Sequence, residues 1–198
     1  MDHALLAQDL AQEARRLSAL GLMACTAGNL SARLGGSTGD LLVSPSGIDK
    51  GDLTADAFIR CAAEGTPLEP GRKPSDETRL HAALYRATGC GAVVHGHGIH
   101  AVALGLRGGD RVVFSGIEML KAFAGTTTHA CTRTIPIVEN DQDMTPLAER
   151  VLAARVEEMP AVLVRGHGVY AWGRTVAEAG RHLETVEWLC RLRLLSGL

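Results

Sequence analysis

The chain has 198 residues, of which 46% are hydrophobic and 21% are charged, and its formal net charge is -2 at pH 7. This length supports one well-covered hydrophobic core and is short for two, so we expect a single domain over residues 1–198. Charges of both signs are scattered along the chain, which leaves no basic stripe for nucleic acid and no polybasic patch for a membrane surface. We therefore expect neither of these partners.

Cysteine usage and the N-terminal segment indicate the compartment. The five cysteines are Cys25, Cys61, Cys90, Cys131 and Cys190. Their odd number, irregular spacing and lack of a Cys-x-x-Cys pair predict reduced thiols. The polar N-terminal segment does not read as a signal peptide, and no apolar run is as long as a membrane span. A cytoplasmic protein is the expectation.

The first half of the chain predicts two helices and three short strands. Leucines recur at helical spacing from Asp2 onward and Gly21 supplies a stop, which predicts an amphipathic helix. Short strands, separated by turn residues, are predicted at residues 29–34, 41–44 and 57–61. Pro74 and Ser75 predict the start of a second helix, which is expected to run to about Ala87.

Strands and helices alternate in the second half. Strands are predicted at residues 92–95, 111–114, 135–138, 161–165 and 169–172, the last two as a hairpin. Helices are predicted at residues 117–124, 145–155 and 176–195. We find no internal repeat and no low-complexity linker. The expected architecture is α/β, with helices packed on both faces of one mixed sheet.

An apolar strand runs directly into His95-Gly96-His97. Side chains alternate along an extended backbone, so both imidazoles can face one ion. The glycines permit close backbone approach at a strand end. Because an arbitrary His-x-His is more often a hydrogen-bonded loop pair, the metal interpretation needs a further ligand.

His167 supplies that ligand, since it ends another apolar strand and has glycine on both sides. Catalytic zinc usually takes three protein ligands and keeps one position open. His81 and His100 are expected on helices instead. The remaining histidines, which have no partner motif, are His3, His129 and His182. We therefore predict a metal site made of His95, His97 and His167.

Three polar segments, residues 26–29, 44–47 and 73–76, are rich in Gly, Ser, Thr and Asn. Hydroxyls, amides and free backbone N–H groups bind phosphate, and the helix expected to begin near Ser75 adds a favourable dipole. Each segment alone is more often a turn. Together they suggest an anion cradle.

At these motifs the sequence resembles the class II aldolase and adducin-head superfamily. The residues that carry the resemblance are 44–51, 73–78, 118–121, 135–143 and 165–173, and the match covers nearly the whole chain. It implies a three-layer α/β/α class II aldolase-like fold with a mixed, largely antiparallel sheet. It also implies one Zn2+ per subunit, a small-molecule phosphorylated keto-sugar as substrate, and a homo-oligomer, commonly a tetramer.

The resemblance also implies roles for individual residues. His95, His97 and His167 would be the zinc ligands, Glu118 would be the acid/base, and Glu77 is a second candidate for that role. Phosphate would be bound by Gly28, Asn29, Ser46, Gly47 and Ser75. A glutamate whose pKa is raised by a partly dry pocket would move the proton.

One departure from the family concerns the His-x-His motif, which usually reads His-Thr-His-Ser. Gly96 and Gly98 replace its two hydroxyl residues here, and this puts the local hydrogen bonding in question. Glu118 and the segment 139–143 favour a hydro-lyase. The metal site alone would serve equally well in a class II aldolase or epimerase. A non-catalytic interaction domain resembling the adducin head is the third alternative.

Overall fold

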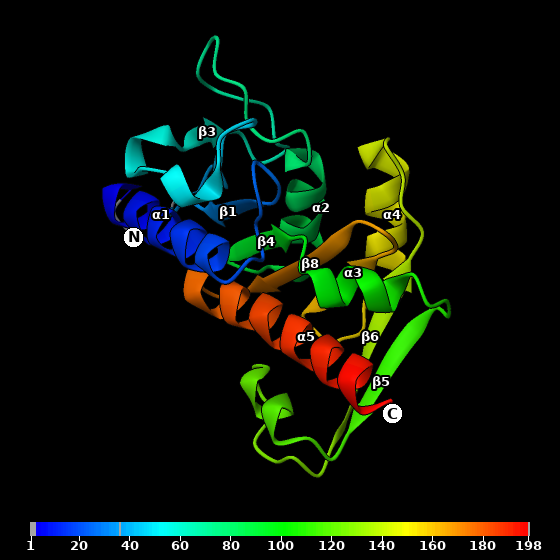
Figure 1. Ribbon diagram of the computed structural model, residues 1–198. Helices are drawn as coiled ribbons and strands as arrows, with labels where there is room; N and C mark the ends of the chain where they lie inside the picture. Colours follow the sequence, from blue (N-terminus) through cyan, green and yellow to red (C-terminus); the bar gives the residue numbers. More distant parts are fainter. Residues whose placement is uncertain (1–2, 36, 198) are drawn as a thin grey trace.

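An eight-stranded sheet runs through the computed structural model, which describes residues 3–35 and 37–197 (Figure 1). The strands are β1 (Asn29–Arg33), β2 (Leu41–Val43), β3 (Ile59–Cys61), β4 (Ala92–Gly96), β5 (Arg111–Ser115), β6 (Thr132–Val138), β7 (Ala161–Val164) and β8 (Gly168–Gly173). Their spatial order is β3-β2-β1-β4-β8-β7-β6-β5. β6 and β7 pair in parallel and the other neighbours are antiparallel, which confirms the predicted mixed, largely antiparallel sheet.

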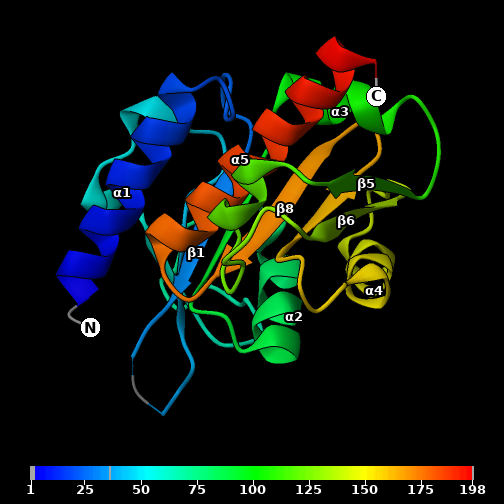
Figure 2. The same ribbon diagram turned by 90° about the horizontal axis from the view of Figure 1, so that it is seen from below.

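Helices cover both faces of this sheet (Figures 1 and 2). One face carries α1 (His3–Ala19), α3 (Ile99–Gly105) and α5 (Val176–Ser196), and the other carries α2 (Thr78–Thr88) and α4 (Met144–Ala154). Three short 3-10 helices complete the described elements: η1 (Lys50–Asp52), η2 (Ala55–Ala57) and η3 (Glu118–Ala122). The predicted three-layer α/β/α fold is therefore confirmed.

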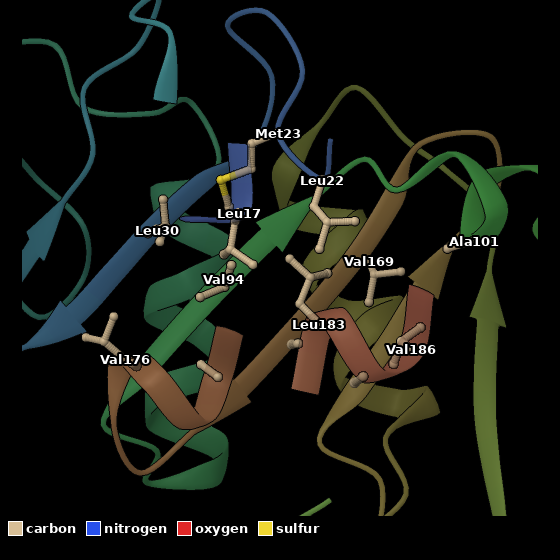
Figure 3. Close-up of a cluster of buried hydrophobic side chains, with 14 of the residues drawn as sticks. Leu17, Leu22, Met23, Leu30, Val94, Ala101, Val169, Val176, Leu183 and Val186 are labelled. Atoms are coloured by element: carbon tan, nitrogen blue, oxygen red, sulfur yellow. The ribbon is translucent and has the colours of Figure 1, made fainter. Parts of the chain in front are cut away.

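The alternation of side chains along β4 divides the buried residues between two cores. Val94 joins the core beneath α1 and α5, where it lies with Leu30 and Leu183 (Figure 3). Val93 points to the opposite face and packs in the core beneath α2 and α4. Because successive residues of a strand face opposite ways, His95 also lies on the α2 face. The strand thus presents an apolar row to one helical layer and a histidine to the other.

Several predicted boundaries shift in the structure, and β6 begins at Thr132, three residues before its predicted start. The second helix begins at Thr78 rather than near Ser75, because Thr78 N–H closes a turn onto the Ser75 carbonyl. Its end agrees with the prediction, since Gly89 adopts the left-handed conformation with φ 69°. The helix predicted over 117–124 is the shorter η3, whose backbone bonds span three residues, and β3 starts after η2. Asp2, the predicted start of the first helix, lies outside the described residues.

The five cysteines are unpaired in the structure, with Cys25 exposed. None of the described helices combines the length and apolar character needed to cross a lipid bilayer.

Candidate active site

The antiparallel register aligns three polar residues in one row across the middle of the sheet. Asn29 of β1 lies opposite His95 of β4, and His95 lies opposite Tyr170 of β8. Directly opposed residues project from the same face of a sheet, so the three side chains are neighbours. The His95 ring is fully buried and stacks on the Tyr170 ring, with centroids 4.1 Å apart and planes 19° apart.

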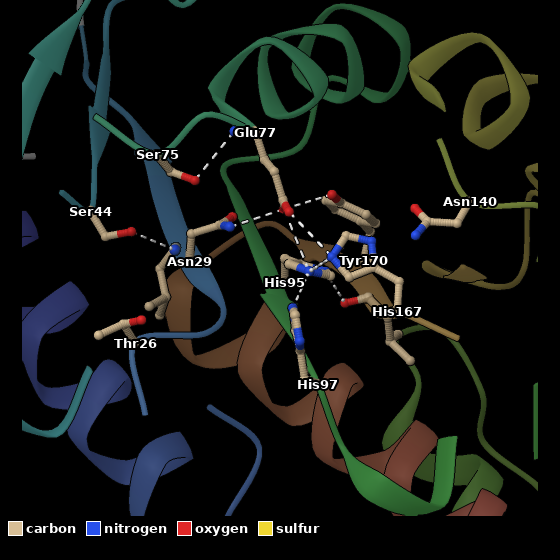
Figure 4. A network of polar contacts seen from close by, with 12 residues as sticks. Thr26, Asn29, Ser44, Ser75, Glu77, His95, His97, Asn140, His167 and Tyr170 are labelled. Carbon is tan, nitrogen blue, oxygen red and sulfur yellow. Dashed lines mark hydrogen bonds and ion pairs between the residues drawn. The ribbon is translucent and has the colours of Figure 1, made fainter. Parts of the chain in front are cut away.

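Two further imidazoles reach His95 from chain segments next to this row. His97 follows the end of β4, and His167 closes the tight turn that joins β7 to β8. Nε2 of His95 lies 2.8 Å from Nε2 of His97 and 3.2 Å from Nε2 of His167. The three ring centroids are 4.7, 4.7 and 4.8 Å apart in pairs, so the rings surround one point (Figure 4).

This arrangement fits a divalent metal ion. Zinc bonded tetrahedrally to nitrogen at its usual distance places ligand atoms about 3.3 Å from each other. The two Nε2 separations are close to that value, and the ligand atoms of the three histidines all lie within 4.8 Å of one another. Simple hydrogen bonding among the rings explains less, because the Nδ1 of His95 lies 3.1 Å from the Val169 carbonyl and donates its proton there. The Nε2 of a neutral His95 is then a bare lone pair directed at the shared point.

Burial keeps the histidines in the form that binds a metal. It lowers the pKa of His95 to about 3, and it lowers the pKa of His97 as well. Both rings are therefore neutral near pH 7. A metal ion would not have to compete with protons for these two nitrogens.

The Glu77 carboxylate lies directly beside the histidines. It stands at the N-terminus of α2, and its Oε2 accepts hydrogen bonds from Tyr170 Oη at 2.6 Å and from Asn29 Nδ2 at 3.0 Å. The same Oε2 is 3.5 Å from Nε2 of His95, and Oε1 is 3.4 Å from Nε2 of His167. A carboxylate oxygen 3.5 Å from the bare Nε2 lone pair of His95 is unfavourable unless a cation or a proton separates the two atoms. The contact therefore gives a second reason to place a cation here.

The pKa of Glu77 departs from the expectation of a raised value. Burial by itself would raise it, but the adjacent imidazoles and the two hydrogen-bond donors outweigh burial. The pKa of Glu77 consequently lies below its usual range, and the group is an ionised carboxylate at neutral pH. The expectation considered only a dry pocket and missed the donors that stabilise the charged form.

Glu118, the other predicted acid/base, lies apart from this cluster. Its side chain is 69% exposed on η3, and the partners recorded for it are Lys121 and, at 3.5 Å, Nδ1 of His129. The hydrogen bond from Lys121 lowers the pKa of Glu118, so a raised pKa is wrong for this residue also. η3 is attached to α5, where Arg181 donates to the carbonyl of Ala122. The role of Glu118 stays a prediction.

The predicted phosphate-binding loops meet beside the row. Ser46 N–H donates to the Lys73 carbonyl at 3.1 Å, and Ser75 N–H donates to the Ser44 carbonyl at 3.1 Å, so segments 44–47 and 73–76 lie side by side. Thr26, Asn29, Ser44 and Ser75 gather on the same side of Glu77 (Figure 4).

Two of these loop residues, Gly28 and Asn29, are constrained by contacts with His95 and Glu77. Gly28 has φ +76°, and a Cβ there would lie 2.8 Å from the carbonyl oxygen of His95, so only glycine fits without movement. Asn29 is 5% exposed, and one N–H of its side-chain amide donates a hydrogen bond to Glu77. Its second amide N–H remains available for a ligand. Gly47 is exposed, with φ +78° and open space around it.

Two residues of the site were missed as individuals by sequence reasoning. Tyr170 is fully buried and orients Glu77. Lys50 is 1% exposed, and its Nζ donates to the carbonyls of Thr26 at 2.8 Å and Ile48 at 2.7 Å, which ties segment 26–29 to segment 44–51. Burial lowers the pKa of Lys50. Tyr170 and Lys50 both lie inside motifs identified in the sequence, but their hydrogen bonds join segments that are far apart in the chain.

The family model described as Class II Aldolase and Adducin N-terminal domain matches residues 8–194. A methylthioribulose-1-phosphate dehydratase of Gluconacetobacter diazotrophicus is 41% identical over 190 residues, covering 94% of this chain and 91% of that protein. The protein of the same name from Serratia proteamaculans is 45% identical over 179 residues, covering 88% and 86%.

Among solved structures, an L-fuculose-1-phosphate aldolase from Thermus thermophilus superimposes with a TM-score of 0.80 at 28% sequence identity, and the match covers 100% of both chains.

His81 is one of the buried histidines through which the stability of the protein should depend on pH. It is fully buried on α2, with Nδ1 2.7 Å from Ser31 Oγ, and burial lowers its pKa from 6.5 to about 4. The folded protein therefore keeps His81 neutral at a pH where the unfolded chain binds a proton. Stability from this group is complete above pH 6.5 and is lost as the pH falls toward 4.

We expect the free energy of unfolding of the metal-free protein to fall between pH 7 and pH 5. His81→Gln should remove about 2 kcal/mol of that decrease, because glutamine does not titrate. Urea unfolding at the two pH values measures it. The control is His129→Gln, whose parent side chain is 60% exposed and which should leave the decrease unchanged. An equal decrease in the His81→Gln and His129→Gln proteins would contradict the assignment.

Proposed function

This chain belongs to the Class II Aldolase and Adducin N-terminal domain family, and on that premise we propose that it is a methylthioribulose-1-phosphate dehydratase. The enzyme is a hydro-lyase of methionine salvage that converts 5-methylthioribulose 1-phosphate to 2,3-diketo-5-methylthiopentyl 1-phosphate. The observation that carries the proposal is the match to relatives of that name at 41% and 45% identity over nearly whole chains. The three-histidine site beside a carboxylate supplies parts that suit this chemistry.

We propose that His95, His97 and His167 hold one Zn2+ per subunit. Three nitrogen ligands with a further position free for substrate are typical of catalytic zinc. When bound, the ion supplies a Lewis acid that polarises the substrate ketone and makes the adjacent C–H more acidic. Tyr170 and Asn29 hold the nearby carboxylate in place while this happens.

Glu77 and Glu118 are the proposed acid/base residues. Glu77 is ionised, and its Oε2 accepts the hydrogen bonds from Asn29 and Tyr170. Its Oε1 accepts neither of them, so Oε1 is the oxygen that would take a proton from the substrate carbon. The elimination removes that C–H proton together with the neighbouring hydroxyl, which leaves as water after it receives a proton. The resulting enol tautomerises to the diketone. Glu118 is the second candidate for the acid/base role.

We propose that Gly28, Asn29, Ser46, Gly47 and Ser75 bind the substrate phosphate. The adjacency of segments 44–47 and 73–76 supports this, because it brings backbone N–H groups and hydroxyls together near the start of α2. Lys50 adds a buried positive charge whose recorded hydrogen-bond acceptors are the neutral carbonyls of Thr26 and Ile48. A phosphate nearby would balance that charge.

The reaction itself tests the function. Zinc-loaded protein incubated with 5-methylthioribulose 1-phosphate should produce the absorbance of the diketone. His167→Ala should reduce bound zinc from about one ion per chain to a small fraction, as measured by elemental analysis, and should abolish the product. Zinc-loaded protein that forms no diketone would refute the proposal, and release of dihydroxyacetone phosphate from a sugar phosphate would favour an aldolase.

Substitution of each glutamate distinguishes the proposed roles of Glu77 and Glu118. Glu118→Gln should lower kcat by about 100-fold or more and leave zinc content unchanged, because the side chain lies outside the histidine cluster. Glu77→Gln should lower kcat and also weaken zinc binding. The control is Glu69→Gln, which removes a half-buried carboxylate that pairs with Arg72 three residues away, as Glu118 pairs with Lys121, and that also accepts from Arg60 N–H. Wild-type kcat in Glu118→Gln would leave Glu77 alone in the role.

We further propose a cytoplasmic homotetramer. Its support is a set of large apolar side chains exposed on α3 and beside it and on α5, with Ile99 68%, Leu106 64% and Trp188 42% exposed. Large apolar side chains left exposed to solvent can mark a protein interface. Light scattering should give four chain masses of 20.9 kDa each, and Trp188→Glu should lower that mass. A monomer mass for the unmodified protein would contradict the tetramer.

A further inference from the structure

The two glycines of His95-Gly96-His97-Gly98 face helix α5, which fills the space that side chains would take. A Cβ on Gly96 would lie 2.7 Å from Cδ2 of Leu183 and 2.9 Å from a backbone oxygen. A Cβ on Gly98 would lie 2.2 Å from Oε2 of Glu187. Leu183 and Glu187 are four residues apart and therefore share one face of α5. The departure from the family motif thus coincides with close packing of this helix.

Glu187 accepts hydrogen bonds from the first backbone N–H groups of α3, which is the capping role expected of a serine at position 98. α3 begins at Ile99, and its N-cap residue, Gly98, has no side chain to accept a hydrogen bond. The Glu187 carboxylate does so from across the interface: Oε1 accepts from His100 N–H at 3.0 Å and Oε2 accepts from Ala101 N–H at 2.9 Å. The first N–H groups of a helix need external acceptors, and a negative charge there is favoured by the helix dipole.

A third contact secures the same carboxylate. Nδ1 of His100 lies 2.6 Å from Oε1 of Glu187, and the Glu187 side chain is only 13% exposed. The carboxylate is therefore held in one position by three nitrogens of α3. This makes the cap a fixed attachment between α5 and the start of α3.

The attachment between α5 and α3 lies next to His97, one of the three clustered histidines. His95 lies inside β4, and His167 is held in a tight turn between two strands. His97 lies in the short connection between β4 and α3, with its N–H bonded to the Leu22 carbonyl at 2.8 Å. The connection is anchored at His97 itself by this bond, and after His97 by the Glu187 cap on His100 and Ala101. A metal ligand must be held within about 0.5 Å of its working position, so both anchors matter.

We propose that Glu187 is a positioning residue for His97, supplying from α5 the hydrogen bonds that a serine at position 98 would supply locally. The inference rests on the proposed metal role of His97. It predicts that the two capping arrangements are interchangeable. Serine at position 98 should become useful only when the Glu187 carboxylate is absent, because both cannot occupy the same space.

The experiment compares Glu187→Ala, Gly98→Ser and the double variant in metal-binding assays. Zinc affinity is measured by chelator competition, and the ligand geometry is read from the absorption spectrum of the cobalt-substituted protein. Glu187→Ala should weaken zinc binding about 10- to 100-fold and reduce the four-coordinate cobalt bands. Adding Gly98→Ser should recover most of the affinity and the bands. The control is Glu184→Ala, which removes a carboxylate of α5 that pairs with Arg16 instead of α3 and should change affinity less than about twofold.

Wild-type zinc affinity in Glu187→Ala, or a loss that serine does not rescue, would overturn the inference. If Glu187→Ala does not fold, Glu187→Gln decides, because it keeps one carbonyl acceptor in place. Affinity lowered in Glu187→Gln would support the cap, and unchanged affinity would overturn it. None of these readouts requires dehydratase activity. Protein that shows the rescue but forms no diketone would refute the proposed function alone.

Discussion

The antiparallel register of β1, β4 and β8 is the constraint on which the site depends. It sets Asn29, His95 and Tyr170 in one row, and the turn before β8 brings His167 to the same place. A slip of one residue in this register would turn His95 toward α5 and separate it from its partners. Backbone hydrogen bonds of the sheet therefore determine the geometry of the histidine cluster before any ligand binds.

The two faces of β4 have different tasks, and each needs the other. On the α2 face, burial keeps His95 neutral, and hydrogen-bond donors help to keep Glu77 ionised. At neutral pH the site therefore offers an uncharged imidazole and a carboxylate, which are both suited to binding a cation. On the α5 face, Gly96 lets the helix approach closely enough for its side chains to support the His97 connection. Packing on the second face thus supports chemistry on the first.

Local patterns in the chain were sufficient for much of this architecture. Short runs between turn residues located the strands, and helical spacing with Gly21 marked the first helix and its end. The three histidines could be selected because each lies at a strand end beside glycine, a signal contained in a few neighbouring residues. Family resemblance extended the prediction to the whole chain, including the three-layer fold. These features depend on residues close in sequence or on a motif set spread along the chain.

The amino-acid sequence by itself determined the α/β class, most element positions and the identity of the three imidazoles. Tertiary structure alone decided the hydrogen-bond partners of Tyr170 and Lys50, the cap from Glu187, and the lowered rather than raised pKa of Glu77. The physical reason is range: propensity and alternation act over a few residues. A hydrogen bond between β8 and α2, or between α5 and α3, depends on how segments far apart in the chain are placed against each other.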